Sequence, residues 1–141
     1  MFLRTKEGSL RATRASRPTV TAVLLAIGIG AVAWARLPGV ARDTFWAEDG
    51  RDFIQAALDD GWRDLLAPYG GYLHLVPRML AGLAVTAVPV EGYALFMSAA
   101  SSLVAGLCGA VVWCTSRQHV RPGWAILIAV TTVLAPLAAR E

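Results

Sequence analysis

Charged residues are scarce in this chain. Asp, Glu, Lys and Arg make up 16% of its residues, whereas 56% are hydrophobic. Soluble domains contain about 25% charged residues on average, so this composition indicates a membrane protein. The net charge of +3 says little by itself, because the positive and negative residues are segregated along the sequence.

Cysteine is nearly absent, and common catalytic motifs are missing. Cys108 and Cys114 lie six positions apart in one apolar run, without CxxC spacing or a nearby His. We therefore expect neither zinc binding nor a disulfide between them. The pattern is typical of small apolar residues that face lipid or a neighbouring helix. There is no Gly-rich phosphate loop, no Ser/His/Asp order and no HExxH motif. Soluble nucleotide-sugar or ATP chemistry is therefore not indicated.

The N-terminal region, residues 1–18, is basic. Five basic residues precede the first apolar run, with only Glu7 against them: Arg4, Lys6, Arg11, Arg14 and Arg17. A basic cluster beside a membrane span predicts a cytoplasmic N-terminus. A nucleic-acid-binding arm is the competing interpretation, but the adjoining hydrophobic run disfavours it. Because that run exceeds the usual signal-peptide core of about 7 to 15 residues, we expect a retained signal anchor.

Four apolar segments predict about four transmembrane helices. Their approximate ranges are 19–37, 73–90, 93–115 and 124–139. Four of the five tryptophans lie near the predicted ends of spans, as in an aromatic belt: Trp34, Trp46, Trp113 and Trp124. We therefore expect an all-α, multi-pass protein of the plasma membrane, with residues 19–141 forming its membrane domain and the lipid bilayer as its surroundings.

The first outer loop, residues 38–71, is acidic. Apolar residues recur at helical spacing from Asp49 to Leu66, and polar residues fill much of the remaining surface. This pattern predicts an amphipathic helix that lies flat in the membrane interface. We expect Gly61 to bend or split the helix, and Pro68–Gly71 to form a turn after it.

The orientation of the later segments contains a conflict. With four spans and a cytoplasmic N-terminus, the loop holding Arg117 and Arg121 falls on the outer face, against the positive-inside bias. If residues 73–90 were re-entrant, that loop would be cytoplasmic. We favour four spans because two arginines are a weak signal and Pro77 lies near the start of its segment. Both arrangements leave the acidic loop on the outer face.

Glu48 and Asp49 are the leading candidates for catalysis. A carboxylate at a membrane surface can accept a proton from an attacking hydroxyl. Asp49 is also a candidate ligand for a divalent cation, Mg²⁺ or Mn²⁺, that bridges phosphate oxygens. The competing interpretation is structural, because Asp49 and Asp52 have the spacing of a capping box. Capping does not account for Glu48.

Tyr72, His74 and Arg78 are candidates for substrate binding. They mark the outer end of the second predicted span, where His74 and Arg78 share a helix face. An arginine is costly in the middle of a bilayer, so Arg78 should lie near the boundary or face a polar cavity. Its guanidinium is suited to a lipid-linked phosphate. The alternative is an arginine that snorkels to the head groups.

Two segments of the sequence together resemble a known family. They are Ala47-Glu48-Asp49-Gly50-Arg51-Asp52-Phe53 and Pro68-Tyr69-Gly70-Gly71-Tyr72-Leu73-His74-Leu75-Val76-Pro77-Arg78. Their order after a first span resembles the GT-C superfamily of membrane glycosyltransferases, and most closely an uncharacterised actinobacterial branch. The resemblance implies inverting transfer of a sugar from a polyprenyl-phosphate donor to an outer-face acceptor. It implies Asp49 as general base or metal ligand, Glu48 as second candidate, and His74 and Arg78 near the lipid phosphate.

Members of this superfamily are usually several times longer than this chain. We therefore expect the sequence to be the N-terminal portion of a larger glycosyltransferase and to be inactive alone. The alternative hypothesis is a non-enzymatic small membrane protein or an inactive remnant, in which Asp49 is only a helix cap. A transporter fragment is a weaker third hypothesis, because Pro77 and Arg78 could mark a broken helix but no second matching half is visible.

Overall fold

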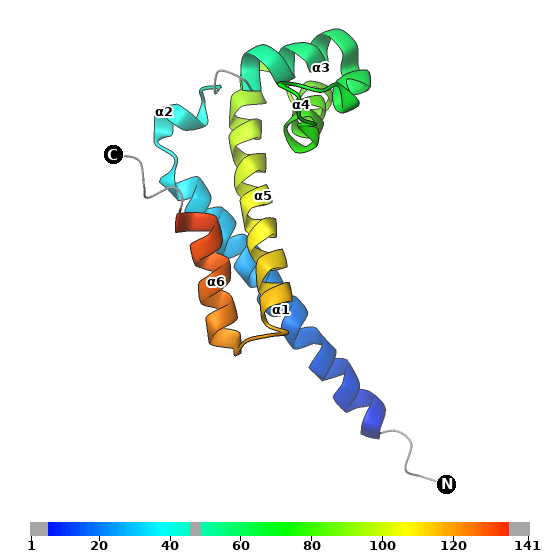
Figure 1. Ribbon diagram of the computed structural model, residues 1–141, viewed down its shortest axis with the longest axis vertical. Coiled ribbons are helices and arrows are strands. Elements are labelled where there is room, and N and C mark those ends of the chain that lie inside the picture. Colours follow the sequence, from blue (N-terminus) through cyan, green and yellow to red (C-terminus); the bar gives the residue numbers. More distant parts are fainter. Residues whose placement is uncertain (1–5, 46–48, 136–141) are drawn as a thin grey trace. The chain divides into compact units, whose positions relative to one another are not determined.

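The computed structural model describes residues 6–45 and 49–135. All regular secondary-structure elements within these ranges are helices, and no strand occurs there. The elements are α1 (Lys6–Arg36), α2 (Gly39–Arg42), η1 (Asp49–Ile54), α3 (Gln55–Asp60), η2 (Gly61–Leu66), α4 (Leu75–Ala87), η3 (Val90–Gly92), α5 (Tyr93–Ser116) and α6 (Pro122–Leu134) (Figure 1). The prediction of an all-α protein is confirmed.

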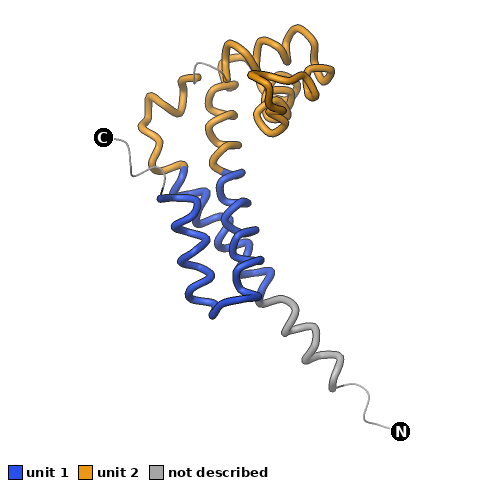
Figure 2. Tube along the Cα trace, in the orientation of Figure 1, with its two compact units in different colours: residues 1–33, 103–141 blue, residues 34–102 orange. Residues whose placement is uncertain are grey.

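The chain divides into two compact units. Unit 1 comprises residues 1–33 and 103–141, and unit 2 comprises residues 34–102 (Figure 2). The boundary falls within α1 and within α5, so each of these helices contributes to both units.

In unit 1, α1 and the second half of α5 run antiparallel. A Cβ atom added to Gly106 would collide with the carbonyl oxygen of Ala26, so the two backbones are in close contact there. Further along α5, Trp113 belongs to a buried cluster against which Ala22 of α1 packs. The two helices run in opposite directions in Figure 1, so the residue number falls along α1 as it rises along α5. Small residues permit this kind of close helix packing.

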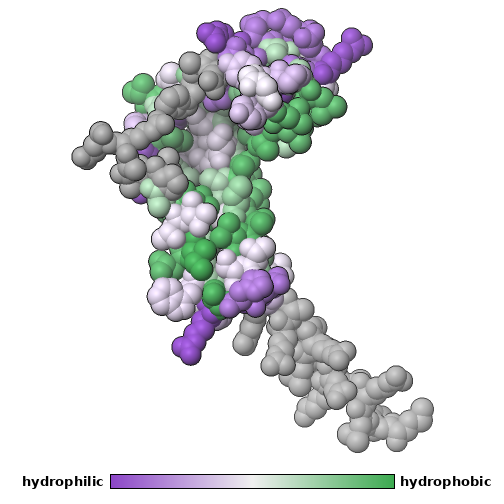
Figure 3. Space-filling view, in the orientation of Figure 1, coloured by the Kyte–Doolittle hydropathy of each residue, from purple (hydrophilic) through white to green (hydrophobic). Residues whose placement is uncertain are grey.

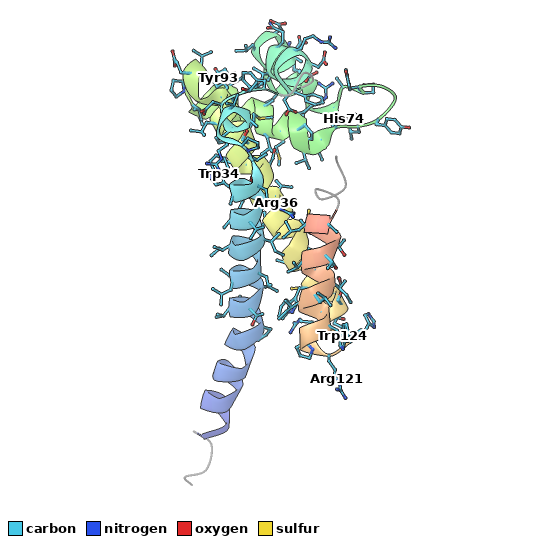
Figure 4. The ribbon with its side chains drawn as sticks, turned by 90° about the vertical axis from the view of Figure 1, so that its left-hand side faces the viewer. Trp34, Arg36, His74, Tyr93, Arg121 and Trp124 are labelled. Atoms are coloured by element: carbon cyan, nitrogen blue, oxygen red, sulfur yellow. The ribbon has the colours of Figure 1, made fainter. Side chains whose placement is uncertain are left out.

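Trp113 belongs to the core of unit 1. Its side chain is 4% exposed and lies with Ala125 and Ala129 of α6, which are fully buried. Trp124 is 62% exposed and lies near Arg121 at the start of α6 (Figure 4). Trp46 lies outside the described residues, so the aromatic belt stays a prediction. Both cysteines are free, with Cys108 exposed and Cys114 partly buried against the core, as expected from the sequence.

Two helical stretches within the described residues are long and apolar enough to cross a membrane. They are Pro18–Arg36 and Val90–Ser116, and they suggest association with a membrane. Helices α4 and α6 have 13 residues each, or about 20 Å at 1.5 Å per residue, against a hydrocarbon core of about 30 Å. The prediction of four spans is therefore not confirmed. The predicted range 124–139 extends partly outside the described residues.

Helix α4 is shorter than the apolar run that contains it. It begins at Leu75, so Pro77 occupies its first turn, where proline is tolerated. It ends at Ala87 because Val88 precedes Pro89 and has an extended backbone, with φ −127° and ψ 146°. The helix therefore ends before the apolar run does.

Three consecutive segments of unit 2, η1, α3 and η2, occupy the range predicted to form an amphipathic helix. Gly61 separates α3 from η2 with φ +60°, a conformation that favours glycine, which confirms the expected bend. One side of η1 and α3 packs against α4. The buried apolar residues there are Phe53, Ile54, Ala57, Leu80, Ala81 and Ala84.

Candidate functional site

A tight turn immediately precedes α4. The backbone N–H of Tyr69 donates to the carbonyl oxygen of Tyr72 at 2.9 Å, and the N–H of Tyr72 donates to the carbonyl oxygen of Tyr69 at 3.0 Å. Between them, Gly70 and Gly71 have φ values of +59° and +86°. Two successive residues in the left-handed region explain the Gly-Gly pair, and the predicted turn is confirmed.

The turn is bonded to η1 through a side chain. The hydroxyl of Tyr69 donates to Oδ2 of Asp52 at 3.0 Å, across 17 positions of sequence. The guanidinium of Arg51 donates to both carboxylate oxygens of Asp52, each at 3.3 Å. Asp52 thus connects the acidic segment to the segment that contains the Gly-Gly turn.

The contacts with Arg51 and Tyr69 change the acidity of Asp52. The pKa of the Asp52 carboxyl is lowered from its ordinary value, mainly by the hydrogen bond from Arg51. Partial burial opposes this shift, and the Tyr69 hydroxyl adds to it. Both hydrogen bonds favour the charged form of the carboxyl, so Asp52 is ionised at neutral pH.

Three rings, those of Phe53, Tyr69 and His74, meet beside this bond and form the ring cluster. Their centroids lie 5.7 Å apart for Phe53 and Tyr69, 5.6 Å for Phe53 and His74, and 5.5 Å for Tyr69 and His74. Tyr69 meets both other rings edge-on, a favourable aromatic geometry. Nδ1 of His74 lies 3.3 Å from the carbonyl oxygen of Tyr72. Figure 4 labels His74 at the start of α4.

Arg78 lies on the buried side of the ring cluster. The residue is 7% exposed, and its guanidinium carbon is 5.4 Å from the centroid of Phe53. Its Nη1 forms an ion pair with Oδ2 of Asp64, which is also largely buried. Within the part of the chain that the structure describes, Nε of Arg78 is buried without a hydrogen-bond partner. Asp64 therefore compensates the charge of Arg78, and one donor remains for another group.

The predicted site residues have different positions in the structure. Asp49 is the first residue of η1, four positions before Phe53, and Glu48 lies outside the described residues. His74 and Arg78 both contact the ring of Phe53. Tyr72 is 75% exposed, and its side chain is on the surface of the turn.

Four residues that the sequence did not single out as functional complete the arrangement: Asp52, Phe53, Asp64 and Tyr69. Asp52, Phe53 and Tyr69 belong to the two segments that resemble the superfamily, but the resemblance implies no role for them. Asp64 is one of the polar residues of the predicted amphipathic helix. Their partners lie 14 to 17 positions away for the two polar contacts, and helical periodicity carries no information about such pairings.

The described residues contain no set of ligands for a metal ion. No group of three or more His, Cys, Asp or Glu side chains converges among them. Asp52 is bonded to Arg51 and Tyr69. Glu48, the residue next to Asp49, lies outside the described residues, so the divalent cation expected at Asp49 stays a prediction.

Comparison of the chain with protein-family models, with curated proteins and with solved structures gives no match.

Proposed function

We propose that this chain is the N-terminal part of an integral-membrane glycosyltransferase of the GT-C type. The enzyme would transfer a sugar from a polyprenyl phosphate to an acceptor on the outer face of the plasma membrane, with the N-terminus in the cytoplasm. The supporting observation is the contact between the two sequence segments that resemble the superfamily. Asp52 and Phe53 come from the first segment, and they contact Tyr69, His74 and Arg78 of the second.

The proposed chemistry begins at Asp49. Its carboxylate accepts the proton of an acceptor hydroxyl, and the hydroxyl oxygen attacks the anomeric carbon of the donor sugar. The new carbon–oxygen bond forms as the bond to phosphate breaks, and the polyprenyl phosphate leaves with the bonding electrons. Attack from the side opposite the phosphate inverts the anomeric centre. Glu48 is the second candidate for the base.

Positive and hydrogen-bonding groups suited to the donor phosphate lie near the same segment. His74 is half-buried in the ring cluster, and the exposed Tyr72 adjoins it in the turn. Arg78 is held by Asp64, so direct binding of phosphate by its Nη1 requires Asp64 to give up that contact. In this proposal, Asp64 is the resting partner of Arg78 and holds it next to the ring cluster.

The test is a transfer assay on membranes from cells that express the gene with its downstream sequence. The donors are a panel of radiolabelled monosaccharides on polyprenyl phosphate. Asp49→Asn should abolish transfer without reducing membrane insertion, whereas Asp43→Asn, at an exposed aspartate of the same loop, should leave transfer unchanged. Full activity in Asp49→Asn, or no transfer from any donor by the wild type, would count against the proposal.

A second candidate is a non-enzymatic membrane protein or an inactive remnant. The observation that favours it is that Asp64 with Arg78, and Asp52 with Tyr69, already satisfy one another. Contacts of this kind can serve only to hold the fold. Under this hypothesis, Asp49→Asn and Asp49→Ser, both good helix caps, change nothing that can be measured.

A further inference from the structure

We propose that the whole segment from Leu37 to Gly92, including α4, lies on one side of the membrane. An apolar face of α4 and η2 would rest in the lipid of the outer leaflet. This face consists of Trp62, Leu75, Val76, Met79 and Leu83. The proposal depends on α1 and α5 crossing the membrane and is independent of sugar transfer.

Helices α1 and α5 run in opposite directions in unit 1 (Figure 1). They are in contact there, because Gly106 lies against Ala26 and Ala22 packs against the cluster that contains Trp113. If both cross the membrane, they cross it in opposite directions. The chain between them must then start and end on the same side. A spanning α4 would instead give α1 and α5 the same direction.

The distribution of positive charge also favours this topology. Because α5 returns toward the start of α1 within unit 1, the Ser116–Arg121 loop falls on the side of the basic N-terminus. Arg117 and Arg121 would then be cytoplasmic, together with the five basic residues of the N-terminal segment. This arrangement removes the conflict with the positive-inside rule that four spans create.

The exposed surface of α4 is suited to contact with lipid. Its exposed large apolar residues fall within one arc of the helix: Leu75, Val76, Met79 and Leu83. Its only charged residue, Arg78, lies on the buried side of the helix. In soluble proteins the exposed side of a helix is normally polar. The exposed side of α4 is apolar, although the helix is too short to cross the bilayer, at about 20 Å.

Trp62 extends this apolar surface onto η2. A Cβ atom added to Gly82 would lie 3.1 to 3.3 Å from the Trp62 ring, so the ring covers α4 at that position. The indole is nevertheless 50% exposed. Tryptophan is enriched at the boundary between lipid and water. Figure 3 shows hydrophilic residues gathered over the outer edge of unit 2 and hydrophobic residues beside them.

The net charge of this region indicates how it contacts lipid. Residues 49–87 contain five aspartates and three arginines, so this part is acidic and an anionic lipid surface does not attract it. Contact with lipid must therefore come from burial of apolar area. Chain continuity also places this face at a membrane, because α5, which follows α4 and η3, makes up most of the candidate span Val90–Ser116.

Cysteine labelling of the full chain tests the topology. In a Cys108→Ala/Cys114→Ala background, the variants are Asp60→Cys, Glu91→Cys and Gln118→Cys, all at exposed positions. A membrane-impermeant thiol reagent added to intact cells should label the cysteines at 60 and 91. The cysteine at 118 should react only after permeabilisation. Labelling at 60 and 118 from outside, with 91 protected, is the pattern of four spans and would overturn the proposal.

The depth of the apolar face is tested with an environment-sensitive fluorophore on a single cysteine. Met79→Cys and Asp60→Cys form the matched pair, in vesicles of phosphatidylcholine alone. The fluorophore at 79 should emit at shorter wavelength and lose quenching by aqueous iodide, while that at 60 stays fully quenched. Equal quenching at the two positions would overturn the lipid contact. Neither the labelling nor the quenching measurement requires an active enzyme. A negative transfer assay therefore leaves both results valid.

Discussion

The hydroxyl of Tyr69 donates a hydrogen bond of 3.0 Å to Oδ2 of Asp52. This bond joins η1, where the acidic motif ends, to the Gly-Gly turn that leads into α4. Because the rings of Phe53 and His74 meet the ring of Tyr69 edge-on at the same place, two motifs that are separate in the sequence form one cluster. Substitutions in this cluster should therefore have the clearest effects on the stability of unit 2.

Replacing Tyr69 by Phe should weaken unit 2. The ring contacts remain, but the hydrogen bond to an ionised carboxylate is lost, so the free energy of unfolding should fall by about 1 to 3 kcal/mol. Tyr72→Phe is the matched control, because Tyr72 is 75% exposed, and should change it by less than about 0.5 kcal/mol. Thermal denaturation in detergent, followed by circular dichroism, measures both. Equal midpoints for the two variants would contradict the role of Tyr69.

Acid should release the contacts of Asp52 at a pH below its ordinary pKa of 3.8. Since the folded-state pKa is lowered, the stabilisation is fully present above the unfolded pKa and is lost as the pH falls through the folded one. The measurement is an NMR titration of the Asp52 carboxyl carbon. Arg51→Gln should raise this pKa more than Tyr69→Phe does, because Arg51 is the larger cause of the shift. The reverse order would contradict this assignment.

Local features of the fold could be predicted from the sequence, whereas contacts between distant segments could not. Gly61 and the pair Gly70-Gly71 have positive φ values, and the amphipathic spacing after Asp49 did give helical segments. Each of these features depends on residues within a few positions of one another.

The apolar run at 73–90 is longer than helix α4 because of one local feature of the backbone. Hydropathy counts apolar residues, but the end of α4 is set by the backbone of Val88, which Pro89 forces out of the helical region. The ion pair of Asp64 with Arg78 was missed because 14 positions separate its members. A polar residue on an amphipathic helix is read as solvated until a tertiary contact is known.

Replacing one member of the ion pair between Asp64 and Arg78 should lower the free energy of unfolding far more than replacing both members. The side chains of Arg78 and Asp64 are 6% and 11% exposed, so Asp64→Asn leaves a buried positive charge without its partner. The expected loss is about 3 to 5 kcal/mol of unfolding free energy, whereas Asp64→Leu with Arg78→Met should recover most of it. Chemical denaturation in detergent measures the difference.

The control for this pair is Asp60→Asn, at an exposed aspartate four positions earlier. It should change the free energy of unfolding by less than about 0.5 kcal/mol. If Asp64→Asn is equally mild, the two side chains are not held together in the folded protein, and Asp64 is not the resting partner of Arg78.

Packing of α1 against α5 should depend on Gly106. An alanine Cβ at this position collides with the carbonyl oxygen of Ala26. This oxygen belongs to the backbone and cannot rotate away as a side chain can. Gly106→Ala should therefore destabilise unit 1 by about 1 to 3 kcal/mol, as overpacking does. At Gly109 the obstacle is Cδ1 of Ile29, the end of a flexible side chain, so Gly109→Ala should cost less.

Gly28→Ala is the control in the same unit, because an added Cβ there meets no atom within 4 Å. Alanine is also the better helix former, so this variant should be neutral or slightly more stable. Thermal unfolding in detergent ranks the three variants. If Gly106→Ala matches Gly28→Ala, α1 and α5 do not approach closely at Ala26. The antiparallel contact, which keeps the segment between these helices on one side of the membrane, would then lose its main support.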